Sequence, residues 1–281
     1  MTIRLLIILF AMIGLHVPAT AQNLGWRDVA PENLVLITTR HGITALELNP
    51  DFAPRHAERM REMIRSGDLK GTYFYRVIDG FVAQTGPNGE TSRDWAELKN
   101  ENERPVDLVP FIPFGNADLY APSVGHDPLG FAMAQNEEID KEWLLHCPGA
   151  VAMARNNDPD SGTTDFYITL DAQRYLDRNL TIFARVIDGM QYIQKVERGD
   201  RTVASGVIQP PRTGDKVISV RLAADMPAAT RPSYRVQRPG TGLFEGEKRA
   251  VRVRTSPFFY NKPAEVIDIC DFDVKSEKVE R

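Results

Sequence analysis

An arginine and a glutamine in one apolar stretch are the residues best placed to do chemistry. Residues 74–86 read FYRVIDGFVAQTG, so Arg76 lies among apolar strand-forming residues and Gln84 follows eight positions later. An arginine in an apolar strand is costly unless its guanidinium reaches a partner or a cleft. The spacing leaves two interpretations open: a salt-bridged or snorkelling arginine, or a hydrogen-bond donor held beside a cleft.

Other common chemistries find little support. After residue 21 the chain has four histidines and two cysteines, and none of the histidines is at metal-ligand spacing with another. His146 and Cys147 are adjacent, but successive side chains of a strand point to opposite faces, so they do not chelate easily. No glycine-rich phosphate loop and no G-x-S-x-G motif is present. The net charge of −4 disfavours a nucleic-acid partner.

The first 21 residues, MTIRLLIILFAMIGLHVPATA, have the features of a signal peptide. Arg4 precedes an apolar run over residues 5–15, and Ala19 and Ala21 form the small-x-small pattern expected before cleavage at Gln22. The alternative is an uncleaved membrane anchor, for which the run is short. We expect cleavage, export to the periplasm or the medium, and no stable membrane insertion afterwards.

Short strands separated by turn residues make up most of the chain. Helical spacing predicts one helix that starts at Pro54 and ends before Gly67, and a shorter helix over 189–196. The order favours an antiparallel barrel or sandwich. Residues 87–144 read as a long irregular segment, which is usually functional or carries small elements of its own. Strands are predicted over 33–39, 41–48, 72–77, 81–84, 150–153, 166–170, 182–186 and 217–222.

The chain changes character after about residue 225. Residues 226–240 contain three prolines and read as a linker. Residues 250–255 (AVRVRT) and 266–274 (VIDICDFDV) both alternate and are predicted to pair as a β-hairpin. Such a tail can hardly fold alone, so it should pack against the main domain or a partner. Cys270 in the tail and Cys147 in the body are either joined by a disulfide or remain two separate buried thiols.

Three segments, in order, resemble motifs of bacterial cyclophilins. Residues 74–86 resemble FHRVIPGFMxQGG, residues 153–169 (MARNNDPDSGTTDFYIT) resemble MARTxDxDSATSQFFIN, and residues 175–190 (YLDRNLTIFARVIDGM) resemble W/F-LDxxxxVFGKVxxGM. The resemblance covers about residues 33–225. It implies a mainly β fold, a closed eight-stranded antiparallel β-barrel capped by two helices.

The resemblance also sets the predicted domain organisation. A signal peptide (1–21) precedes a cyclophilin-like isomerase domain (22–225), which has an insertion at about 87–144. A linker and C-terminal extension (226–281) follow.

The family implies peptidyl-prolyl cis-trans isomerase activity with no metal or organic cofactor. Arg76 matches the catalytic arginine, and Gln84 matches the glutamine that binds the substrate backbone and helps orient the arginine. The positions that match the apolar proline pocket and its rim are Phe81, Val82, Met153, Tyr167, Tyr175 and Leu176. The stretch that meets the extended peptide corresponds to Ala154, Arg155 and Asn156.

Some positions depart from the family pattern. Tyr75 replaces the histidine before the catalytic arginine. Tyr175 replaces tryptophan or phenylalanine at the rim, which should reduce cyclosporin-type binding. Asp165 replaces a glutamine near the peptide cleft, where it could pair with Arg76 or Arg155.

Two functions of different class remain. The first is a monomeric isomerase that acts on proline-containing segments of exported proteins. Rotation about an X-Pro bond has a barrier of about 20 kcal/mol because amide conjugation is lost, so no nucleophile is required. A fixed guanidinium can donate to the nitrogen of the twisted amide more strongly than to the planar one. The alternative is a catalytically weak cyclophilin-fold module that binds peptides or a partner protein.

Overall fold

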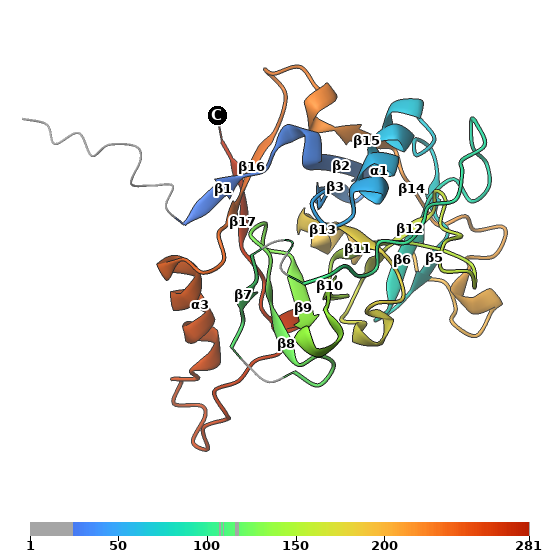
Figure 1. Ribbon diagram of the computed structural model, residues 1–281. Helices are drawn as coiled ribbons and strands as arrows, with labels where there is room; N and C mark the ends of the chain where they lie inside the picture. The colour runs from blue at the N-terminus through green and yellow to red at the C-terminus, as the bar shows by residue number, and fades with distance from the viewer. Residues whose placement is uncertain (1–24, 107, 109, 116–117, 281) are drawn as a thin grey trace, which may run out of the picture.

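A curled eight-stranded antiparallel sheet forms the body of the protein (Figure 1). The computed structural model describes residues 25–106, 108, 110–115 and 118–280. The predicted mainly β architecture with eight antiparallel strands is confirmed. Along the sheet the strands follow the order β15 (Ser219–Leu222), β2 (Leu34–Thr39), β3 (Gly42–Leu48), β13 (Ile182–Asp188), β11 (Ala150–Met153), β12 (Phe166–Thr169), β6 (Val82–Thr85) and β5 (Arg76–Ile78).

The two ends of this sheet are bridged without full closure, so the body is a half-barrel and the predicted closure of the barrel is not observed. Within the described residues the edge strands β15 and β5 do not pair with each other. A separate two-stranded unit joins β4 (Tyr73–Phe74) to β14 (Asp215–Lys216). Because β4 leads into β5 and β14 leads into β15, this short unit holds the two edges of the half-barrel together.

Helix α1 (Pro54–Ser66) packs on the inner side of the curled sheet. Pro54 stands in its first turn, where the missing N–H is no loss, and Gly67 ends it with a left-handed φ of 85°. Met60 and Met63 on its buried face belong to one core with inward residues of the strands. The second predicted helix is confirmed as the short α2 (Met190–Ile193), which adds Ile193 to the same core.

The insertion contains a sheet of its own and covers the outer side of the half-barrel. Its strands follow the order β10 (Lys141–Leu144), β9 (Ala132–Asn136), β8 (Ser123–His126) and β7 (Ile112–Pro113). Strand alternation explains the two-sided burial: Ala83 and Phe166 face the inner core, whereas Val82 and Tyr167 face a second core that includes Trp143 of the insertion. Residues 87–144 thus carry small elements of their own, as one of the two expectations for this segment had it.

The C-terminal extension does not contain the predicted hairpin. Residues 250–252 belong to helix α3 (Gly242–Arg252), which the Thr241 side chain caps by accepting from the Phe244 N–H. Phe244 and Val251, seven residues apart on one helix face, pack into the outer core, so helical burial overrides the alternation of AVRVRT. Residues 269–271 form a 3₁₀ turn instead of a strand.

The strands of the extension lie elsewhere in the sequence. β16 (Ser233–Gln237) falls inside the stretch predicted as a linker and pairs with β17 (Ser276–Val279) on one side and β1 (Trp26–Asp28) on the other. Tyr234 and Val236 of β16 pack on the outer side of β2 and β3, in one cluster with Leu34, Leu36 and Ala45. Figure 1 shows the green sheet of the insertion and the red helix α3 of the extension on the same flank of the body.

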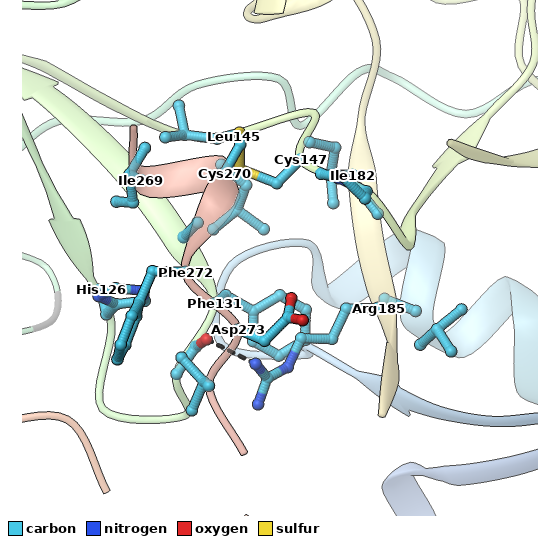
Figure 2. A pocket seen from close by; sticks show the side chains of 18 residues that line it. His126, Phe131, Leu145, Cys147, Ile182, Arg185, Ile269, Cys270, Phe272 and Asp273 are labelled. Carbon is cyan, nitrogen blue, oxygen red and sulfur yellow. Dashed lines mark hydrogen bonds between the residues drawn. A yellow bond between two sulfur atoms is a disulfide. The ribbon is translucent and has the colours of Figure 1, made fainter. Parts of the chain in front are cut away.

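A disulfide joins Cys147 of the body to Cys270 of the extension, with their Cα atoms 4.8 Å apart. The two cysteines therefore form a disulfide and are not two separate buried thiols. Figure 2 shows it at the edge of a small cavity between the body, the insertion and the extension. On the other side of this cavity the Arg185 guanidinium lies 4.8 Å from the Phe131 ring and donates to the Gly130 carbonyl at 2.6 Å.

A buried ion cluster reinforces the same junction. Glu47 of β3 accepts from both guanidinium ends of Arg27 in β1, at 2.6 and 2.7 Å, and forms an ion pair with Arg185 of β13 at 3.3 Å. Both arginines also donate to the carbonyl of Leu129 in the insertion. The insertion, the N-terminal strand and the body are therefore held together by charge-assisted bonds as well as by apolar packing.

No helix in the described part of the chain is long and apolar enough to span a bilayer. Residues 1–21, where the signal peptide is predicted, lie outside the described residues.

Candidate active site

Three adjacent strands place the predicted catalytic pair in one row. Arg76 of β5 is directly opposite Gln84 of β6, and Gln84 is directly opposite Tyr167 of β12. Residues that pair directly across antiparallel strands project from the same face of a sheet. The outer face of the half-barrel therefore presents a guanidinium, an amide and a phenol side by side.

The guanidinium of Arg76 is fixed at two points. Its Nη1 donates to Gln84 Oε1 at 3.1 Å, and its Nε donates to the backbone carbonyl of Ser205 at 2.8 Å. Within the described residues its remaining N–H groups make no further hydrogen bond. Burial lowers the pKa of Arg76 below its usual value, yet the group stays cationic near neutral pH. A preoriented donor with free N–H groups is thus available at this face.

Gln84 is itself oriented by a tyrosine. The Gln84 Nε2 donates to the hydroxyl of Tyr75 at 2.7 Å, which leaves the amide oxygen turned toward Arg76. Burial raises the pKa of Tyr75 above its usual value, so the hydroxyl is neutral and able to accept this bond. Tyr75, which the sequence marked as a departure from the family, therefore takes part in orienting the site.

An apolar rim lies next to the guanidinium. Phe81 is partly exposed, its ring lies 5.7 Å from the Arg76 guanidinium carbon, and it stacks on Tyr175 with centroids 6.5 Å apart. Tyr175 is 63% exposed, Leu176 beside it is partly buried, and Val82 behind Phe81 is buried. These residues form an apolar surface directly beside the guanidinium.

A hollow opens between the guanidinium and this rim. Arg201, exposed, stands at its edge, and Gln173 forms part of its wall, where its side chain donates to the Gly80 carbonyl at 2.9 Å. Neither residue nor Ser205 was predicted for the site. Ser205 contributes a backbone carbonyl, which carries no side-chain signal in a sequence. The full lining is Arg76, Ile78, Phe81, Gln173, Tyr175, Arg201 and Ser205.

One predicted pocket residue lies elsewhere. Met153 is opposite Phe166 in the pairing of β11 with β12, and both belong to the inner core. Tyr167, one residue further along β12, projects to the outer face instead. Strand alternation thus separates Met153 from the other pocket residues, and the structure does not bring it to the rim.

The predicted peptide-facing stretch is held by local bonds. Arg155 donates to the carbonyl of Asn179 at 2.8 and 3.0 Å and to that of Asn156 at 2.7 Å, which fixes the turn that follows β11. The Asn156 N–H is bonded to Ser161 Oγ at 3.0 Å, and Ala154 is partly buried against the outer core. The stretch is therefore ordered next to the site, and its contact with a peptide stays a prediction.

Asp165 does not pair with an arginine. Within the described residues it forms no ion pair with Arg76 or Arg155; its Oδ1 accepts from the Asn88 N–H at 2.9 Å. A Cβ at Gly86, whose φ is 140°, would overlap the Asp165 carboxyl, so glycine is required there. Burial raises the pKa of Asp165 above its usual value. The idea that Asp165 sequesters an arginine is wrong for this structure, because the carboxyl is turned to the loop after β6.

His146, whose position before Cys147 disfavours metal binding, is a neighbour of the site. Its Nε2 lies 2.9 Å from the Tyr167 hydroxyl, and the two rings are stacked. Burial raises the pKa of Tyr167 above its usual value, so the phenol stays protonated. The signal available in the sequence was a histidine directly before a cysteine, which does not by itself indicate this contact.

Removal of the Gln84 side chain should reveal its orienting role. Gln84→Ala leaves Arg76 with the Ser205 bond, so the guanidinium loses one of its two fixed points. We expect kcat/KM for an X-Pro peptide to fall about tenfold, with the thermal unfolding midpoint nearly unchanged. Gln191→Ala, in an exposed glutamine of α2, is the matched control. A Gln84→Ala rate equal to that of the control would remove Gln84 from the site.

The fold and the site together define a cyclophilin-type protein. Residues 34–221 match the model of the "Cyclophilin type peptidyl-prolyl cis-trans isomerase/CLD" family. Because this range is more than half of the chain, the protein belongs to that family, whose activity is peptidyl-prolyl cis-trans isomerisation.

Individual relatives agree with this assignment. A "Probable peptidyl-prolyl cis-trans isomerase" of Brucella suis is 31% identical over 197 residues, which is 69% of this chain and 85% of the relative. The human "Peptidyl-prolyl cis-trans isomerase-like 1" is 28% identical over 166 residues, 59% of this chain and 80% of that protein. The crystal structure of cyclophilin AquaCyp293 from Hirschia baltica superposes with a TM-score of 0.76 at 27% identity, covering 92% of this chain and 95% of that one. The structural likeness therefore extends into the added segments.

Proposed function

We propose that this protein accelerates rotation about X-Pro bonds of exported proteins, with Arg76 as the group that stabilises the twisted amide. The observation that carries the proposal is the guanidinium fixed by Gln84 and Ser205 beside the apolar rim of Phe81 and Tyr175. Family membership supports the reaction, and this geometry supports the residue roles.

The proposed mechanism requires no covalent chemistry. The proline ring rests on the apolar rim while the preceding carbonyl swings, and the substrate backbone bonds to the Gln84 side chain. As the amide twists, its nitrogen becomes pyramidal, and the lone pair that is delocalised into the carbonyl of the planar amide becomes localised on nitrogen. An N–H of Arg76 donates to that lone pair in the transition state and not in either ground state. Such preferential binding lowers the barrier for both directions of isomerisation.

A protease-coupled assay on a proline-containing tetrapeptide tests this proposal. Uncatalysed exchange takes tens of seconds or longer at 25 °C, so acceleration by the protein is easily resolved. We expect acceleration that depends on Arg76, with the size argued in the Discussion. A rate no faster than buffer, together with measurable binding of the same peptide, would favour the alternative of a peptide-binding or partner-binding module.

That alternative is favoured by two features of this chain. Asp165 places an acid where the family has glutamine, and the insertion and extension build a large outer core next to the site. Both features are compatible with catalysis as well, because Asp165 does not contact Arg76 and the rim remains exposed. A monomeric state is part of the main proposal, and light scattering in solution should give the mass of a single chain.

The substrate class depends on export, which rests on the sequence of residues 1–21. We expect protein recovered from outside the cytoplasm to begin at Gln22 when its intact mass is measured. Full-length chain that keeps Met1 and stays in the membrane fraction would contradict cleavage and support the anchor instead.

A further inference from the structure

A chain of buried polar side chains runs behind the apolar rim. The Tyr167 hydroxyl contacts His146 Nε2 at 2.9 Å, and His146 Nδ1 contacts Asp177 Oδ1 at 3.1 Å. The other oxygen of Asp177 accepts from Arg174 Nε at 2.6 Å. His146 is fully buried and the Tyr167, Arg174 and Asp177 side chains are nearly so. A network of this kind is costly to bury unless every member is satisfied, and here each has a partner.

The carboxylate fixes the direction of the first bond. Asp177 can only accept, so His146 Nδ1 carries a proton and donates to it. With the single ring proton on Nδ1, Nε2 accepts from the Tyr167 hydroxyl. The hydroxyl is therefore turned into the protein, and the buried ring lies in the outer core together with Val82 and Phe81 of the rim.

The same histidine holds a second wall of the site. Its backbone N–H donates to Asp177 Oδ1 at 2.8 Å, and its carbonyl accepts from the Gln173 N–H at 2.7 Å. Gln173 and Asp177 flank the 3₁₀ turn Arg174–Leu176, which carries the rim residues Tyr175 and Leu176. His146 thus contacts the strand that carries Tyr167 and both ends of the turn that carries the rim.

The insertion completes the network. Arg174 donates to the two oxygens of Asp118 at 2.9 and 3.1 Å, and Asp118 also accepts from the N–H groups of Tyr120 and Ala121 at 2.8 and 2.9 Å. Burial opposes the charge on Asp118, but these bonds hold its pKa below the usual value. The Arg174 guanidinium also lies 5.0 Å from the Tyr120 ring. The insertion is therefore bonded to the turn that carries the rim.

We infer that His146 is a positioning residue for the proline site, holding Tyr167 and the Tyr175–Leu176 turn in the arrangement that receives the proline ring. The inference deepens the proposed function and rests on it. Among the described residues, the His146 side chain bonds to Asp177 and Tyr167 and makes no hydrogen bond to Arg76. Removal of the His146 side chain should therefore weaken binding of the proline ring and leave the Arg76 guanidinium in place.

A double-mutant cycle between His146 and Tyr167 tests the inference. His146→Leu leaves the Tyr167 hydroxyl buried without an acceptor, so the ring should shift and KM should rise about tenfold. Contacts with the proline ring are equal in the planar and twisted states, so kcat should stay within about twofold of wild type. In Tyr167→Phe/His146→Leu both partners are apolar, and the backbone bonds of residue 146 to Gln173 and Asp177 still hold the turn, so KM should return to within about threefold of wild type. A KM unchanged in His146→Leu, or a double variant as impaired as the single, would overturn the inference.

A spectroscopic measurement covers the case in which His146→Leu does not fold. The ¹⁵N resonances of the His146 ring in the wild type should report a protonated Nδ1 and an accepting Nε2. Tyr167→Phe should shift the Nε2 resonance and leave Nδ1 nearly in place. A ring spectrum that is identical in the two proteins would mean that the hydroxyl does not bond to His146, and the inference would fail.

A control variant separates a loss of positioning from a general loss of stability. His126→Phe replaces another fully buried histidine, which contacts Phe114, Phe244 and Phe272 in the outer core. It should change the unfolding midpoint and leave KM unchanged, so a general loss of stability is distinguishable from a loss of positioning.

If wild-type protein did not accelerate isomerisation, the proposed function would fail. The Kd of the same peptide, measured by calorimetry across the cycle, would still decide the role of His146.

Discussion

Alanine in place of Arg76 is expected to lower kcat/KM for an X-Pro peptide by about 10²–10³-fold, mainly through kcat. The guanidinium N–H has a lone pair to meet only when the amide is twisted, so its loss raises the barrier and leaves peptide binding largely unchanged. The fold should be retained, because β5 and β6 are paired through their backbones and the Arg76 side chain is partly exposed. The protease-coupled assay over a range of peptide concentrations gives kcat and KM separately.

Two variants sharpen this result. Arg76→Lys keeps the charge but lacks the planar fork, so it cannot bond to Gln84 Oε1 and the Ser205 carbonyl while presenting a further N–H. It should recover little of the lost kcat. Arg221→Ala removes one exposed arginine from the opposite edge strand β15 and is the matched control for the change in net charge. Activity in Arg76→Ala within about threefold of that control would exclude arginine-assisted catalysis.

The pairing of Arg76 with Gln84, the predicted catalytic pair, could be predicted from the sequence because the two residues lie on one local hairpin. Two short strands flank the turn at Asp79 and Gly80, and in the observed register Ile78 is opposite Val82 and Arg76 is opposite Gln84. Once such a hairpin is assumed, side chains at these positions must share a face. The same reasoning could have excluded Met153, because β11 and β12 alternate and Met153 shares its face with Phe166.

The rest of the site depends on contacts that no local pattern encodes. Tyr167 and His146 are 21 residues apart, and Arg174 and Asp118 are 56 apart on separate loops. The extension is harder still, since β16 pairs with Trp26–Asp28 from the other end of the described chain. Its sequence, with prolines on both sides, reads as a linker when the partner strands are unknown. Tertiary pairing decides the structure there, and local propensity does not.

The largest effect on stability is expected from the loss of the Cys147–Cys270 disulfide. The bridge closes a loop of 123 residues between the body and the extension. Opening a loop of this length restores conformational entropy to the unfolded chain and should reduce the free energy of unfolding by about 2–5 kcal/mol. Cys147→Ser/Cys270→Ser is the variant to compare with wild type by urea denaturation, and thiol titration of denatured, unreduced wild type should find no free thiol.

Loss of the disulfide should destabilise the extension before it destabilises the body. Cys270 lies in the 3₁₀ turn Ile269–Asp271, whose Ile269 packs into the outer core, whereas the inner core of the half-barrel has no contribution from that segment within the described residues. We therefore expect limited proteolysis to release the extension from the double serine variant while the body stays protected. Wild type treated with reductant should follow the same pattern. Equal urea midpoints and equal protease resistance for oxidised, reduced and double serine protein would show that β16, β17 and α3 are held by packing alone. In that event the covalent link would contribute nothing to the stability of the native state.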